Sequence, residues 1–252
     1  SYQEASLAIQ YAEIMITEWL GDKFIFNDLH LCRVDLCVNV DVGSPENVTQ
    51  YIRQLYKTNM RRSFKIRGQK NPDINKNARF TATNEEEGLE LAAYNKKHQL
   101  EEELGIPAQE HENILRIEFR LKKESTINKF TDSSLPNDEK IIDLIQRSKN
   151  IMLAALPMLL PDGDYYKLNN AINIVHDRIK SYTLRDCMEL VLRMTANKHG
   201  LKSARKAMRK AGISPNLISN AIAAFNNIGV NPVTLKKNAK VKFLPSFYKY
   251  LN

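Results

Sequence analysis

Three segments of the 252-residue chain alternate apolar and polar residues with the two-residue period of a β-strand. Each segment has one apolar face and one polar face that includes carboxylates. In 33–41, 89–94 and 114–122 these carboxylates are Asp35, Asp41, Glu90 and Glu118. One-sided strands bury the apolar face against another layer. The pattern predicts an α+β fold, with a mixed or antiparallel sheet whose helices cover one face and leave the other face free.

Capping and stop signals place the remaining elements of the first half. A helix is predicted over 2–20 with Gly21 as its stop, a second begins at Pro45 after the N-cap Ser44, and a third covers 96–104 before Gly105. Strands are predicted near 23–31, 33–42, 78–83, 87–94 and 114–122.

Residues 124–137 are polar and rich in turn-forming side chains, which predicts a linker between two domains. The domain 1–123 carries the sheet. The domain 138–252 is mostly helical, with helices predicted at 138–156, 164–179, 183–198, 201–211 and 214–228. Because the chain opens at Ser1 without a methionine, we expect the first domain to lack an upstream segment.

Tyr94 stands at the end of the strand 89–94, on its polar face, and is followed by Lys96 and Lys97. A tyrosine hydroxyl can attack a phosphodiester and remain attached to the phosphate. The ordinary pKa of tyrosine is about 10, so nearby cations are needed to favour the phenolate. Lys96 and Lys97 are placed to supply them, which makes Tyr94 a candidate nucleophile.

The carboxylates of the polar faces offer oxygen ligands for a hard cation. If the strands are neighbours, Asp35, Asp41 and Glu118 converge on one site, and Mg²⁺ or Mn²⁺ is the expected ion. The competing interpretation is a solvated sheet face on which the carboxylates only balance arginines.

At these residues the chain resembles the replication initiation factor family of Gram-positive plasmids and phages. The segment 33–39 is similar to that family's Arg-hydrophobic-Asp strand, and Tyr94-Asn95-Lys96-Lys97 with 115–122 is similar to its nucleophile segment and Arg-hydrophobic-Glu strand. Filamentous-phage replication nicking proteins share a similar layout. The resemblance, which covers roughly 20–125, implies site-specific nicking at an origin of rolling-circle replication. It implies Tyr94 as nucleophile, Lys97 as the partner lysine, and Asp35 and Glu118 as metal ligands.

The chain departs from the family pattern at two points. The second acid that often follows the first by four residues is here Asn39, and the next acid is Asp41, so both stay open as the further ligand. No His-hydrophobic-His pair occurs, since His30-Leu31-Cys32 breaks that pattern. A carboxylate-only site therefore fits better than a histidine-ligated one.

Positive charge is concentrated where DNA could be held. Residues 181–252 hold 13 Lys and Arg against 2 acidic residues, whereas 1–180 hold 24 against 27. The connector 57–79 is also basic, with Asp73 as its single acid. Clustered cations bind phosphates through counterion release. The predicted DNA-binding residues are Arg61, Arg62, Lys65, Arg67, Lys96, Arg116, Arg120, Arg205 and Lys206.

The segment 201–227 has the pattern helix, glycine turn, capped helix, which is compatible with a helix-turn-helix. Its second helix has no Lys or Arg, and the cations lie on the helix before it. Plain helical packing with a basic face is therefore the favoured interpretation.

Composition excludes several classes of protein. No apolar stretch is long enough to span a membrane and no signal peptide is present, so no membrane partner is expected. The three cysteines form no Cys-x-x-Cys pair, which indicates a reducing cytoplasm and argues against structural zinc.

The expected partner is origin DNA, double-stranded with a single-stranded or hairpin nick site. A host helicase or polymerase and a second protomer are further candidates. The competing functions are a non-catalytic DNA-binding regulator of plasmid or phage copy number and, third, a structural interaction protein.

Overall fold

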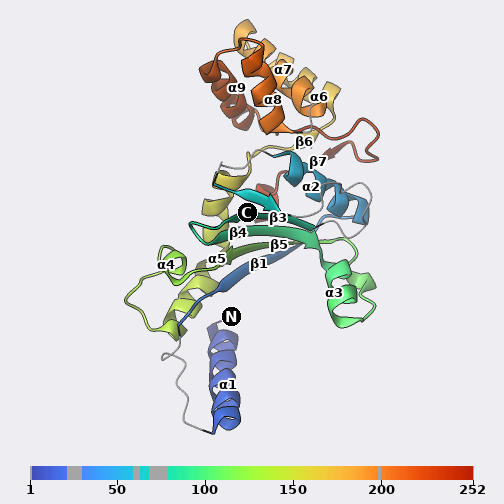
Figure 1. The fold of residues 1–252 in the computed structure, drawn as a ribbon. Helices are drawn as coiled ribbons and strands as arrows, with labels where there is room; N and C mark the ends of the chain where they lie inside the picture. The colour runs from blue at the N-terminus through green and yellow to red at the C-terminus, as the bar shows by residue number, and fades with distance from the viewer. Residues whose placement is uncertain (1, 22–29, 59–62, 68–78, 198–199, 252) are drawn as a thin grey trace.

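The computed structural model describes residues 2–21, 30–58, 63–67, 79–197 and 200–251. It contains a five-stranded antiparallel sheet with helices in the N-terminal half, followed by a mostly helical C-terminal region (Figure 1). The predicted α+β class is therefore confirmed. No helix among the described residues is long and apolar enough to cross a membrane.

The sheet has the strand order β1-β5-β4-β3-β2, and every neighbouring pair is antiparallel. Four of the predicted strands are confirmed, and the prediction near 23–31 falls mostly on residues outside the described part, while 30–31 form no strand. The three-residue β2 is too short to show a period. The strands are β1 (Val34–Asp41), β2 (Lys65–Arg67), β3 (Arg79–Asn84), β4 (Leu89–Asn95) and β5 (Ile114–Leu121).

Two long helices, α2 (Pro45–Lys57) and α5 (Asn137–Leu159), contact the sheet (Figure 1). The Ser44 hydroxyl accepts a hydrogen bond from the Asn47 N–H at 3.2 Å, so the predicted N-cap of α2 is confirmed. The helix buries an apolar stripe against the alternating apolar side chains of the strands. This core includes Val48, Ile52, Leu55, Leu91, Leu115, Ile117 and Phe119.

Shorter elements surround this core. The helix α3 (Lys96–Leu104) has the predicted bounds and ends at Gly105, whose φ of 64° is left-handed. A 3-10 helix, η2 (Gln109–His111), follows it. In the segment 124–137, α4 (Glu124–Ile127) has a buried Ile127, and Phe130 packs edge-on against Phe119 with ring centroids 5.9 Å apart.

The first helix, α1 (Tyr2–Leu20), contacts α5 and lies at the edge of the structure (Figure 1). The predicted helix over 2–20 is thus confirmed. Its exposed residues include five large apolar side chains, Leu7, Tyr11, Ile14, Met15 and Trp19, beside polar ones such as Glu4 and Glu18.

The C-terminal region contains α6 (Leu168–Arg178), α7 (Tyr182–Asn197), α8 (Leu201–Lys210) and α9 (Pro215–Asn227), as predicted within a few residues. The helix predicted over 164–179 begins late, because 165–166 form β6 (Tyr165–Tyr166), which pairs with β7 (Phe243–Leu244). That partner is distant in sequence, so a local period could not reveal it. A short helix, α10 (Tyr248–Leu251), is the last element that the structure describes.

The C-terminal segment packs against Tyr51 of α2, one of the helices that contact the sheet. The fully buried Tyr51 donates its hydroxyl to the Pro245 carbonyl at 2.8 Å, and its ring lies 4.7 Å from that of Phe247. Residues far apart in sequence therefore share one core.

The helical region also contacts α2 directly, at the start of α8. Gly200, at the start of α8, has a φ of 122°, and a Cβ placed there would lie 2.5 Å from the Lys57 carbonyl oxygen. The two backbones thus touch with no side chain between them, which only glycine permits.

We expect Gly200→Ala to lower the free energy of unfolding by about 2 to 4 kcal/mol, since it adds a steric clash to a strained φ. Gly212→Ala is the matched control, because Gly212 also has a positive φ of 84° but no atom within 4 Å of an added Cβ. In this control the free energy of unfolding should fall by only about 1 to 2 kcal/mol. Urea denaturation measures both variants, and equal losses would show that the contact with Lys57 is unimportant.

Candidate functional site: the polar face of the sheet

The polar side chains of four strands meet on one face of the sheet. Residues paired across an antiparallel ladder point to the same side, so the register aligns Asp35, Arg120 and Glu90 in one row. The next row holds Glu118. The row after it is formed by Asn39, Arg116, Tyr94 and Arg79.

Glu118 is the centre of this face. Its side chain is buried and accepts hydrogen bonds from the Tyr94 hydroxyl, from Arg116 Nε at 2.7 Å and from Arg120 Nε at 2.9 Å. Burial alone would raise the pKa of Glu118, but these donors outweigh it and lower the pKa to about 2. Glu118 is therefore a fully paired carboxylate at neutral pH.

Tyr94 is held as a neutral phenol. The residue is only 4% exposed, and its hydroxyl donates to Glu118. Burial, and then the hydrogen bond to the carboxylate, raise the pKa of Tyr94. The Arg79 guanidinium lies 4.6 Å from the centroid of the ring, which is a cation–π contact. The predicted pair of Tyr94 and Glu118 is thus in direct contact.

A second buried carboxylate, Glu90, extends the network. It accepts from Arg120 Nη1 at 2.6 Å, from Lys122 Nζ at 3.2 Å and from the Thr83 hydroxyl at 3.0 Å. Burial opposes ionisation of Glu90, yet these donors lower its pKa. Neither Glu90 nor Arg79 was predicted as a site residue. The sequence could have indicated both residues, because each lies at an alternate position on the polar side of its strand.

Of the other predicted metal ligands, Asp35 shares Arg120 with Glu118, whereas Asp41 lies apart. Asp35 pairs with Arg33 at 2.6 Å and lies 3.6 Å from Arg120 Nε. Asp41 pairs across the ladder with Ile114, which is four residues from Glu118 and therefore about 13 Å along the strand. Its carboxylate accepts from the Gly43 N–H at 2.7 Å.

The residues that the structure describes include no group of three or more His, Cys, Asp or Glu side chains able to hold a metal ion. As arranged, the three predicted carboxylates do not fit a shared metal. Asn39, the alternative ligand, accepts from Arg116 Nη1 at 3.3 Å instead.

The two lysines after Tyr94 point elsewhere. Lys97 Nζ donates to Gln109 Oε1 at 2.6 Å and lies 3.9 Å from Glu101, so it joins α3 to η2. Lys96 donates to Gln99 at 2.8 Å. Neither lysine contacts the Tyr94 hydroxyl, which donates to Glu118 instead.

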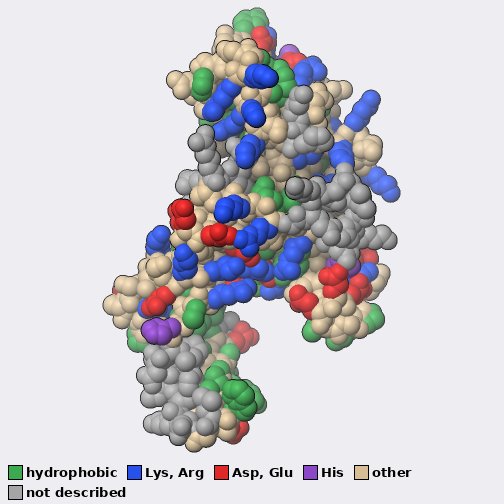
Figure 2. Space-filling model, in the orientation of Figure 1, with side chains coloured by type: hydrophobic (Ala, Val, Ile, Leu, Met, Phe, Trp, Pro, Cys, Tyr) green, Lys and Arg blue, Asp and Glu red, His purple; other side chains and the backbone are tan. Residues whose placement is uncertain are grey.

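Apart from Lys96 on α3, the described members of the predicted DNA-binding set fall into two separate surfaces. Arg116 and Arg120 belong to the sheet face, and Lys65 and Arg67 at its edge both pair with Glu85. Arg205 and Lys206 lie on α8, in the helical region, whereas Arg61 and Arg62 lie outside the described residues. Figure 2 shows Lys and Arg side chains over the sheet and over the helical region on the same face of the molecule.

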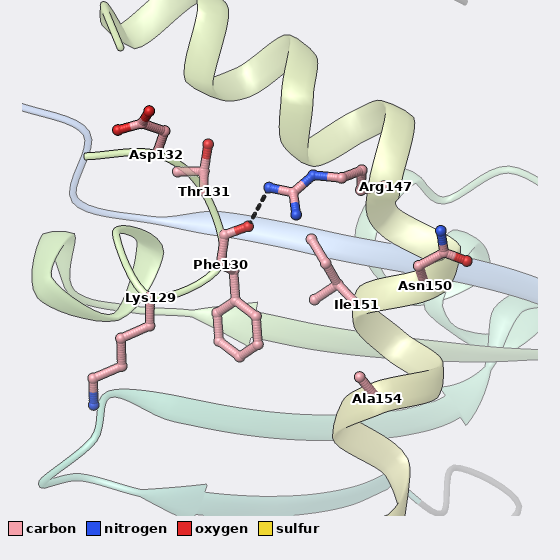
Figure 3. Close-up of a pocket in the computed structure, with 8 residues that line it drawn as sticks. All are labelled: Lys129, Phe130, Thr131, Asp132, Arg147, Asn150, Ile151 and Ala154. Atoms are coloured by element: carbon pink, nitrogen blue, oxygen red, sulfur yellow. Dashed lines mark hydrogen bonds between the residues drawn. The ribbon is translucent and has the colours of Figure 1, made fainter. Parts of the chain in front are cut away.

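A surface pocket of about 410 Å³ lies away from this cluster, between α5 and the segment 129–132 (Figure 3). Arg147 crosses it and donates to the Phe130 carbonyl at 2.6 Å. None of its lining residues was predicted as a site residue, and none belongs to the polar face of the sheet.

Comparisons of the chain with models of protein families, with curated proteins and with solved structures give no match.

The pairing of Glu118 predicts a specific pH dependence. Its pKa lies near 2 in the folded chain against an ordinary 4.5, so its stabilising effect is complete above pH 4.5 and is lost as the pH falls toward 2. Glu118→Gln should cost about 3 kcal/mol at pH 7. This difference from the unsubstituted chain should shrink between pH 4.5 and 2 in urea unfolding.

Glu85→Gln is the control for this experiment, since Glu85 is an exposed carboxylate that also pairs with cations. This substitution should change the free energy of unfolding little at any pH. A Glu118→Gln deficit that stays constant from pH 7 to 2 would contradict the assigned pairing.

Proposed function

We propose that the polar face of the sheet binds origin DNA and nicks it to initiate rolling-circle replication, with Tyr94 as the nucleophile. The observation that carries this proposal is the hydrogen bond from Tyr94 to Glu118, surrounded by the guanidinium groups of Arg79, Arg116 and Arg120. The cluster joins an oxygen nucleophile, a proton acceptor and cations whose geometry suits a phosphate.

The proposed reaction is a transesterification. The Tyr94 oxygen bonds to the phosphorus, the bond from phosphorus to the 3′-oxygen breaks, and the 5′-phosphate remains on the tyrosine. The hydroxyl proton passes to the Glu118 carboxylate, and the departing 3′-oxygen takes a proton from water. The free 3′-hydroxyl can then prime a polymerase.

Glu118 is a weak base while both arginines bind it, as its low pKa indicates. A DNA phosphate would compete for the hydrogen bonds of Arg116 and Arg120. Loss of those donors raises the proton affinity of the carboxylate. Substrate binding would thus prepare Glu118 to accept the tyrosine proton.

The family resemblance adds Mg²⁺ or Mn²⁺, with Asp35, Glu118 and Asp41 as its predicted ligands. Because the described carboxylates do not form a group that could hold the ion, the proposed steps do not pass through it. A helicase, a polymerase and a second protomer remain predicted partners, and the cytoplasm remains the predicted location.

A non-catalytic DNA-binding regulator is the second candidate. It is favoured by the burial of Tyr94 and by the complete pairing of Glu118, which are also the marks of a structural network. In this case the arginines bind DNA and the tyrosine only positions the carboxylate.

Tyr94→Phe separates the two functions. The chain should nick a supercoiled plasmid carrying the candidate origin, such as the DNA that flanks its own coding sequence, and should become covalently attached to it. Tyr94→Phe should abolish both the nick and the adduct, since the phosphate acceptor is missing. Denaturing gels with labelled DNA measure the adduct.

Tyr182→Phe is the matched control, because Tyr182 is 73% exposed on α7 and lies outside the cluster. Parallel reactions with Mg²⁺, Mn²⁺ or a chelator test the metal. Equal nicking by Tyr94→Phe would place the nucleophile elsewhere, and DNA binding without a nick in any reaction would favour the regulator.

A further inference from the structure

The helices α8 and α9 have the spacing of a helix-turn-helix. Four residues, Ala211–Ser214, connect them, and Gly212 in this turn has a φ of 84°. Both helices pack on α7, which supports them from behind. The buried side chains are Leu201, Ala204 and Met208 on α8 and Ile218, Ala221, Ile222, Ala224 and Phe225 on α9.

The exposed face of α9 has an unusual composition. A solvated helix face normally carries charged residues, but α9 contains none. Its exposed residues are proline, alanine, serine and asparagine. Asparagine is a weak helix former, so a merely solvated face gains nothing from it. The exposed residues are Pro215, Asn216, Ser219, Asn220, Ala223, Asn226 and Asn227.

These side chains are free to bind a ligand. The side-chain amides of Asn216 and Asn220 form no hydrogen bond with any described residue, and both lie in the first half of α9. Asparagine can donate to and accept from one adenine edge, and alanine can contact a thymine methyl group. A narrow face of small residues also lets a helix approach bases closely.

The preceding helix carries the positive charge. Lys202, Lys206, Arg209 and Lys210 are exposed, and none of them pairs with a carboxylate in the described part of the chain. The half-buried Arg205 has an Nε atom with no hydrogen-bond partner there. Residues 200–227 contain no Asp or Glu. The cations of α8 therefore have no counter-charge on either helix.

We propose that α8 and α9 form a helix-turn-helix that reads duplex DNA in the major groove. The first half of α9, with Asn216, Ser219 and Asn220, contacts base edges and prefers sites with A·T pairs. The cations of α8 bind the flanking phosphates, as the first helix of such a unit does. The absence of Lys and Arg from α9, which favoured plain packing at the sequence level, is thus compatible with base recognition.

This inference rests on the proposed function only in that DNA is the ligand. It assigns the choice of origin sequence to the helical region and leaves phosphodiester cleavage to the sheet. The two activities can be measured separately, because duplex binding without a divalent ion requires no nick.

The test begins with the full chain and a pool of 30-base-pair duplexes that have a randomised centre. Selection should return a preferred sequence rich in A·T pairs. Fluorescence anisotropy then measures binding to the preferred duplex and to a scrambled one. Asn216→Ala and Asn220→Ala should each weaken binding to the preferred duplex about 5- to 100-fold and leave the scrambled duplex unaffected.

Two controls separate base contacts from phosphate contacts and from damage to the fold. Lys206→Gln should weaken binding to both duplexes alike. The slope of the logarithm of the binding constant against the logarithm of the salt concentration should become less steep by about one. Asn150→Ala, an exposed asparagine on α5, should change nothing. Circular dichroism melting verifies that each variant is folded.

The inference is overturned if selection returns no preferred sequence, if the Asn216 and Asn220 variants keep full preference, or if RNA duplexes bind better than DNA. Sequence-specific binding that depends on α9, in a chain that never nicks DNA, would support the inference and refute the proposed nicking. Nicking that does not depend on α9 would support the proposed nicking and refute the inference about α9.

Discussion

The arrangement of the sheet depends on one buried charge, the carboxylate of Glu118. A charge removed from water is tolerated only when it is paired and hydrogen-bonded, and here the donors come from β4 and from both sides of Glu118 on β5. A shift of one residue in the register would turn Glu118 into the apolar core and Phe119 out of it. The polar cluster and the hydrophobic core therefore select the same register.

The faces of the strands could be read from sequence, because a period of two fixes which side chains share a side. This is why the meeting of Tyr94 with Glu118 was predictable. Distances along the strands were not, since they require the register and the strand order. Asp41 lies on the expected face but far from Glu118, and Lys97 is drawn toward η2 by a contact that no local pattern contains.

The helical region illustrates a different limit. The bounds of α8 and α9 follow from Gly200, Gly212 and Pro215, although Ser214 makes no side-chain cap, whereas the short strand β6 depends on a partner near residue 243. The helical spacing of the apolar residues indicates which side of α9 is buried, but the sequence could not show that this side packs on α7. With Ile218 and Phe225 in the core, the asparagines of α9 are exposed.

The close contact between Gly200 and Lys57 links this outer surface to the sheet. With no side chain between the two backbones, α8 rests directly on the end of α2. This contact and the hydrogen bond from Tyr51 to Pro245 place the C-terminal part of the chain against α2. Under the functions proposed for the two surfaces, α9 would bind one DNA sequence while Tyr94 attacks a phosphate elsewhere on the same duplex. The number of base pairs between these two points would then be set by the distance between α9 and Tyr94 in the protein.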